Sequence, residues 1–116
     1  FFFACATFGY LVKLPNNKGG LLMSKDLYRK KTQIFKALAH PTRLFIIDKL
    51  EKGECCVCEF VNELDVDFST VSKHLSVLKN AGIIIDEKRG QQVFYRLVMR
   101  CVCFFSHCIE TFLNKE

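Results

Sequence analysis

Residues 69–79, STVSKHLSVLK, are the stretch of sequence that decides the fold. Val71, Leu75 and Leu78 recur at helical spacing, so they predict a helix that buries one apolar face. The other face carries hydroxyls and lysines, and no acidic residue lies within the stretch. Such a helix fits the major groove of B-DNA, where hydroxyl and lysine side chains bond phosphates and base edges.

A shorter helix is expected just before this one. Its apolar residues follow the i, i+3, i+4, i+7 pattern and are Val57, Phe60, Val61 and Leu64. Residues 65–68 form the predicted turn, and Ser69 is expected to cap the helix that follows. Two helices joined by a four-residue turn predict a helix-turn-helix whose second helix reads DNA.

A β-hairpin is expected directly after the reading helix. Residues 83–85, III, begin a strand because they are β-branched and apolar, and Val93, Tyr95 and Leu97 alternate on the return strand. The polar turn at residues 89–92, RGQQ, lies between them, and its basic tip would reach phosphate or the minor groove. The fold class predicted is therefore mainly α with a β-hairpin, a winged helix-turn-helix.

The remaining sequence supplies three more helices, for a total of five plus a two-stranded wing. One runs from Ser24 to about Ala39 and includes the stripe of Leu27, Ile34, Phe35 and Leu38; the others span residues 41–53 and 98–113. Residues 1–22 combine an apolar run with loop residues and are expected to be an unstructured or spurious extension. Residues 23–116 are then the DNA-binding and dimerisation domain.

The candidate DNA contacts lie on the reading helix and the wing. They are Ser69, Thr70, Ser72, Lys73, His74, Ser76, Lys79, Arg89, Gln91 and Gln92. His74 has two interpretations, as a DNA contact or as a half-buried packing residue, because it lies three residues after Val71. The net charge of +5 fits a polyanionic partner without requiring one.

The chain contains seven cysteines, an odd count, and three of them fall within residues 55–58, CCVC. This is a poor disulfide framework, and no secretory signal is evident. The apolar run at residues 1–14 is too short to span a bilayer. We therefore expect a cytoplasmic protein with reduced thiols, no membrane partner and no enzymatic activity. Clustered reduced thiols serve as metal ligands, redox groups or small core residues.

Residues 35–97 resemble the ArsR/SmtB family of metal-responsive transcriptional repressors, and in particular its arsenical-repressor branch. The stretches that carry the resemblance are residues 35–44 (FKALAHPTRL), 54–60 (ECCVCEF), 69–75 (STVSKHL), 81–86 (AGIIID) and 90–97 (GQQVFYRL). The resemblance implies a homodimer packed through its first and last helices. It also implies binding to a palindromic operator and release from it when an inducing ion binds.

By the same resemblance, Cys56 and Cys58 are the metal ligands. Soft thiolates favour arsenite or antimonite, and also accept cadmium, lead or zinc, while no permanent cofactor is required. The cysteine that some relatives carry three residues further on is Val61 here. Cys55 is favoured as the third ligand, and Cys101 and Cys108 on the last helix are the additional thiols that could serve.

The mechanism expected from the sequence is a distortion of the start of the third helix. Residues two apart on a regular helix point about 200° apart, so Cys56 and Cys58 could hold one ion only if the helix bends there. The bend would misplace the reading helix and weaken DNA binding. The helix N-terminus should also lower the pKa of these thiols.

Three other readings of the cysteines stay open. The first is a repressor of the same fold switched by oxidation of Cys55, Cys56 or Cys58. The second is a closed zinc site that joins Cys55 and Cys58 to two cysteines of the last helix and serves folding only. The third, a C-x-x-C oxidoreductase, is disfavoured because no strand–helix–strand frame surrounds the motif.

Overall fold

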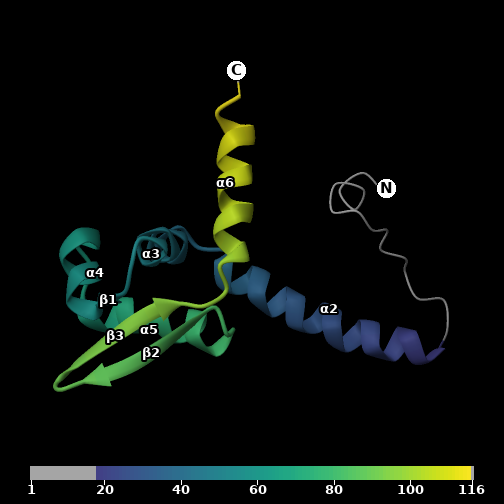
Figure 1. Ribbon diagram of the computed structural model, residues 1–116, viewed down its shortest axis with the longest axis horizontal. Helices are drawn as coiled ribbons and strands as arrows, with labels where there is room; N and C mark the ends of the chain where they lie inside the picture. The colour runs from purple at the N-terminus through teal and green to yellow at the C-terminus, as the bar shows by residue number, and fades with distance from the viewer. Residues whose placement is uncertain (1–17, 116) are drawn as a thin grey trace. The chain divides into compact units, whose positions relative to one another are not determined.

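The computed structural model describes the backbone of residues 18–115 and the side chains of residues 24–115. The elements in order are α2 (Lys18–Leu38), α3 (Pro41–Glu51), β1 (Cys55–Cys56), α4 (Val57–Leu64), α5 (Phe68–Asn80), β2 (Ile84–Arg89), β3 (Gln92–Leu97) and α6 (Cys101–Leu113) (Figure 1). The chain divides into two units between Thr32 and Gln33, and the arrangement below is that of the second unit. The five predicted helices and the hairpin are confirmed. The expectation that residues 1–22 are an unstructured or spurious extension stays a prediction: residues 1–17 lie outside the described residues, and α2 begins within the expected extension, at Lys18.

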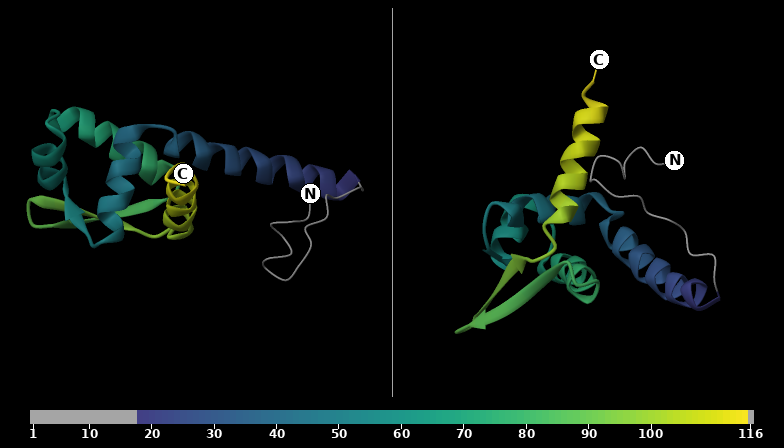
Figure 2. Two further views of the ribbon diagram at one scale, coloured as in Figure 1. Left: turned by 90° about the horizontal axis from the view of Figure 1, so that it is seen from above. Right: turned by 45° about the vertical axis from the view of Figure 1, so that its right-hand side comes forward.

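The sheet has three antiparallel strands in the order β1-β3-β2, one more than predicted. The predicted hairpin is β2 and β3, which run side by side to a tip at Gly90 and Gln91 (Figures 1 and 2). Gly90 has a φ of 64°, a left-handed conformation that glycine adopts without strain. The additional strand, β1, pairs Cys55 with Tyr95 and Cys56 with Phe94. It attaches the cysteine segment directly to the wing.

The helix-turn-helix is α4 and α5, joined by residues 65–67. Asp65 ends α4 in the left-handed conformation, with a φ of 54°. The N-cap of α5 is Asp67, whose carboxylate accepts a hydrogen bond from the Thr70 backbone N–H at 3.2 Å. The prediction that Ser69 caps this helix is therefore wrong, because Asp67 is the capping residue and α5 begins at Phe68.

One hydrophobic cluster holds these elements together. Val71, Leu75 and Leu78 of α5 are fully buried, as predicted, and Phe60 of α4 belongs to the same cluster. Strands β2 and β3 contribute Ile84 and Leu97. The reading helix is thus fixed between the helix before it and the sheet after it.

Several predicted boundaries and faces differ from those observed. α2 begins at Lys18 rather than Ser24, and the last helix begins at Cys101 rather than Val98. Helical spacing predicts that α3 turns Leu44, Ile47 and Leu50 inward; Ile47 and Leu50 are buried, but the third buried side chain is Ile46, and Leu44 is 40% exposed. α3 packs against α5, β3 and α6, so its buried face is broader than one helical stripe, and Leu44 lies instead in an apolar groove that α3 lines together with the end of α2 and α6. No helix among the described residues is both long and apolar enough to cross a membrane.

Candidate DNA-binding surface and thiol site

The outer face of α5 presents the side chains that were predicted to meet DNA. Lys73, Ser76 and Lys79 are exposed, and Ser72 is half-buried. Lys73 makes no ion pair with any side chain of residues 24–115, whereas Lys79 is bound to Asp86 of β2 at 2.9 Å. Lys73 is therefore the lysine of this helix most available to phosphate.

The hydroxyls at the start of α5 are engaged by the cap. Ser69 Oγ donates to Asp67 Oδ2 at 2.7 Å, and Thr70 Oγ1 donates to Asp67 Oδ1 at 2.5 Å. These hydrogen bonds, with that of Thr70 foremost, lower the pKa of Asp67 to about 2. A charged carboxylate thus stands beside the predicted DNA contacts. The sequence signal for it was an aspartate two residues before a Ser-Thr pair.

His74 lies half-buried against the start of α3. Its Nδ1 is 3.1 Å from Arg43 Nη1, and its ring centroid is 4.4 Å from that of His40. Burial lowers the pKa of His74, and the neighbouring His40 and Arg43 lower it further. Arg43 also donates to the Ala37 carbonyl oxygen at 2.6 Å. This environment favours the packing interpretation, in which His74 anchors α5 to α3.

The wing carries the other predicted DNA contacts, Arg89, Gln91 and Gln92, and all three are exposed. Arg89 is not free, however. Its guanidinium bonds both carboxylate oxygens of Glu54, at 2.6 and 3.0 Å, and Glu87 Oε1 at 2.8 Å. The pairing of Arg89 with Glu54 and Glu87 has no local sequence signal, because neither glutamate lies on the reading helix or in the polar turn of the hairpin.

The two candidate metal ligands meet at the junction of β1 and α4. Cys56 is the N-cap of α4, with extended backbone angles (φ −92°, ψ 166°), and Cys58 lies in the first helical turn. Their Cα atoms are 5.5 Å apart, and their sulfurs are joined in a disulfide. The assumption that both residues lie on a regular helix is therefore wrong. Because Cys56 lies outside the helix, its sulfur reaches that of Cys58 without any bend.

A glutamate completes this junction. Glu59 Oε2 accepts a hydrogen bond from the Cys56 backbone N–H at 2.9 Å, which fixes the residue where strand turns into helix. Cys56 is buried, whereas Cys58 is exposed. One sulfur-bearing residue is thus held by the fold, and the other is open to an incoming ion or oxidant.

The other four cysteines of the described residues are free thiols. Cys55 is buried and its thiol donates to the Gly53 carbonyl oxygen at 3.6 Å; burial, together with the nearby Glu59, raises its thiol pKa. On α6, Cys101 and Cys108 are exposed and Cys103 is buried. Within residues 24–115, no three metal-ligating side chains come together. The choice of Cys55, Cys101 or Cys108 as third ligand stays a prediction.

A reading helix, the helix before it and a basic hairpin after it define a winged helix-turn-helix DNA-binding protein. Residues 40–86 match the family described as bacterial regulatory protein, arsR family. An HTH-type transcriptional regulator of Methanocaldococcus jannaschii is 46% identical over 74 residues, which cover 63% of this chain and 83% of the relative. The chain therefore belongs to the ArsR family, and it is a transcriptional regulator rather than an enzyme.

Two further relatives agree with this assignment. The arsenical resistance operon repressor of Escherichia coli K12 is 46% identical over 66 residues, so the chain spans only about half of that relative, 56% of its length. The homodimeric winged helix-turn-helix domain of a possible ArsR-family regulator from Mycobacterium bovis has a TM-score of 0.73 and 26% identity, covering 78% of this chain and 88% of that one.

Proposed function

We propose that the protein is a thiol-controlled repressor that binds a palindromic operator as a homodimer in the cytoplasm. A thiophilic ion, arsenite or antimonite above all, binds at Cys56 and Cys58 and releases it; cadmium, lead and zinc suit the same thiolates. The observation that carries this proposal is the meeting of these two sulfurs at the start of α4. The relative that is named an arsenical resistance operon repressor supports it.

The route from the thiol pair to DNA begins at the first turn of α4. An ion shared by the two thiolates of the reduced protein holds the two sulfurs at a fixed separation, because each metal–sulfur bond is about 2.3 Å long for zinc. The first turn of α4 must then shift, and Phe60 transmits the shift to α5 through the common hydrophobic cluster. A third thiolate from Cys55 would require that side chain to leave the core. Cys101 and Cys108 are already exposed.

Lys73 is expected to contact a phosphate. The Lys73→Gln variant should bind duplex DNA selected from a random-sequence pool about tenfold more weakly, and the slope of log affinity against log salt should fall by about 1. Fluorescence anisotropy at several salt concentrations measures both. Lys115→Gln, which removes the same charge beyond the end of α6, is the control. Equal slopes for the two variants would remove Lys73 from the DNA-binding face.

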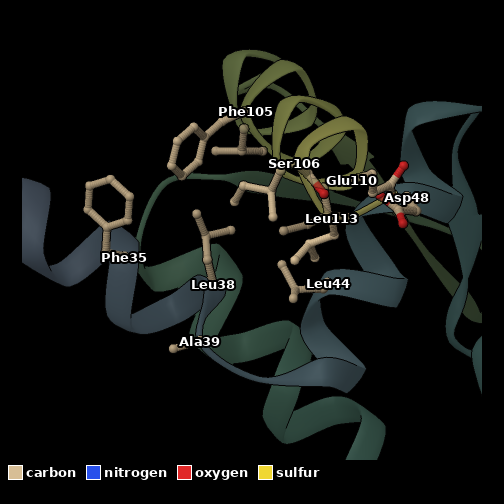
Figure 3. Close-up of a pocket in the computed structure, with 12 residues that line it drawn as sticks. Phe35, Leu38, Ala39, Leu44, Asp48, Phe105, Ser106, Glu110 and Leu113 are labelled. Carbon is tan, nitrogen blue, oxygen red and sulfur yellow. The ribbon is translucent and has the colours of Figure 1, made fainter. Parts of the chain in front are cut away.

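The dimer interface that we propose is an apolar groove between the end of α2, α3 and α6. Its lining includes Phe35, Leu38, Leu44, Phe105 and Ile109 (Figure 3). The rings of Phe35 and Phe105 meet edge to face at 5.9 Å, yet the two residues remain 55% and 50% exposed. A surface this apolar is typical of a protein–protein interface. A second copy of the chain is the occupant that the homodimeric structural relative supports.

The Phe105→Glu variant is therefore expected to be monomeric. A charge in the groove should shift the protein from dimer to monomer in sedimentation velocity at micromolar concentration. Binding of selected DNA should weaken by about 100-fold or more, because two half-sites are no longer engaged together. Thr111→Glu, on the same helix but outside the groove lining, should leave both properties unchanged. A dimeric Phe105→Glu variant would place the interface elsewhere.

A second candidate function is a redox-switched repressor, which the Cys56–Cys58 disulfide specifically favours. Hydrogen peroxide would take two electrons and two protons from the two thiols, forming the disulfide and two molecules of water. This candidate is preferred if peroxide releases the protein from DNA, dithiothreitol restores binding and arsenite has no effect.

A further inference from the structure

Arg89 lies at the end of β2, next to the tip of the wing. Its guanidinium contacts Glu54 before β1, Glu87 on β2 and Phe94 on β3. Its two terminal nitrogens bond the Glu54 carboxylate in a forked geometry, and one of them also bonds Glu87. The guanidinium carbon lies 4.9 Å from the centre of the Phe94 ring. Forked carboxylate bonds and ring stacking are the contacts that fix an arginine most firmly.

This arrangement neutralises Arg89. Its guanidinium and the two carboxylates together carry a net charge of −1, so this cluster offers no positive charge to a phosphate, and the basic side chains left on the wing are Lys88 and Arg96. Arg89 can bind a phosphate only after it leaves Glu54. We name the contact between Arg89 and Glu54 the wing clamp.

The wing clamp is connected to the thiol pair by two short paths. Glu54 lies two residues before Cys56, immediately ahead of β1. Phe94, on which Arg89 stacks, is the register partner of Cys56 in the sheet. The positions of Glu54 and Phe94, which both contact Arg89, therefore depend on the position of the Cys56 backbone.

We infer that Glu54 is a positioning residue that withdraws Arg89 from DNA when the sulfurs of Cys56 and Cys58 are held together. In the structure the sulfurs are joined and the wing clamp is closed. A joined pair ties the end of β1 to the first turn of α4, and so keeps Glu54 beside the wing. Separate thiols leave this segment freer, and Arg89 can exchange Glu54 for phosphate. The inference rests on the proposed function and adds to it a second route, through the wing.

The test compares the reduced protein with protein in which hydrogen peroxide has oxidised Cys56 and Cys58. In this reaction two thiols and one hydrogen peroxide give one disulfide and two waters. The probe is a mixed-sequence DNA duplex, since phosphate contacts are independent of sequence. Variants are Glu54→Gln, Arg89→Gln and the double variant, and anisotropy is followed against salt. Glu63→Gln is the matched control, because Glu63 pairs with Lys49 rather than with Arg89.

We expect oxidised Glu54→Gln to bind about tenfold more tightly than the oxidised wild type, with a salt slope steeper by about one phosphate contact. In the reduced proteins the same substitution should have little effect. In the Arg89→Gln background, Glu54→Gln should not raise the DNA affinity of the oxidised protein further. Glu63→Gln should not raise this affinity in either background.

If Glu54→Gln raised DNA affinity equally with and without Arg89, the inference would be overturned, because the effect would then come only from the loss of one negative charge. If reduced wild type binds and oxidised wild type is weakened, but Glu54→Gln restores nothing, the wing route is wrong while the proposed function stands. If reduced wild type fails to bind DNA at all, both are wrong.

Discussion

The Phe60→Ala variant is expected to lose about 3–5 kcal/mol of its free energy of unfolding. Phe60 has no exposed surface and belongs to the cluster that joins α4 to Val71 and Leu75 of α5. Its removal would leave a cavity between the helix that carries the thiol pair and the helix that reads DNA. Domains of this size are stable by about 5–15 kcal/mol, so the loss is a large part of the total.

Urea unfolding followed by circular dichroism, with reductant present, measures this change. The matched control is Phe68→Ala, which removes the same side chain from a position that is 62% exposed. It should change the free energy of unfolding by no more than about 0.5 kcal/mol. If both variants lost the same stability, Phe60 would not be the anchor of α4, and the proposed transmission from thiols to α5 would have no physical basis.

The helices and the hairpin could be predicted because each has a local signal. The spacing of Val71, Leu75 and Leu78 defines the buried face of α5 whatever the rest of the chain does. The capping residue was harder, because Asp67 and Ser69 are both good N-caps two residues apart. Only the position at which the helix begins distinguishes them.

Features that depend on contacts between distant residues could not be predicted from the sequence. β1 is two residues long, and its strand character comes from pairing with β3. That pairing keeps Cys56 out of the helix, which is why the expected bend is unnecessary. The ion pair of Arg89 with Glu54 joins residues 35 positions apart. Phe35 was correctly placed on an apolar stripe, but periodicity does not distinguish a face that meets the chain's own core from one that meets a partner.

Substitution of Cys56 or Cys58 is expected to have the largest effect on regulation. Serine preserves the size of the side chain but replaces a soft thiolate with a hydroxyl that binds thiophilic ions poorly. Each variant should bind DNA as the wild type does in the absence of ion, because neither residue lies on α5 or the wing. Each should lose the response to arsenite, and a Cys108→Ser variant shows whether an exposed thiol on α6 contributes.

The most direct test of this account is an arsenite titration of the reduced protein bound to DNA selected from a random-sequence pool, followed by fluorescence anisotropy. We expect arsenite to lower the affinity of the wild type for DNA by about tenfold or more, and to leave Cys56→Ser and Cys58→Ser bound. Two results would contradict the claim that this thiol pair controls DNA binding by sensing the ion. One is a wild type that stays on DNA at saturating arsenite, and the other is a serine variant that arsenite releases as readily as the wild type.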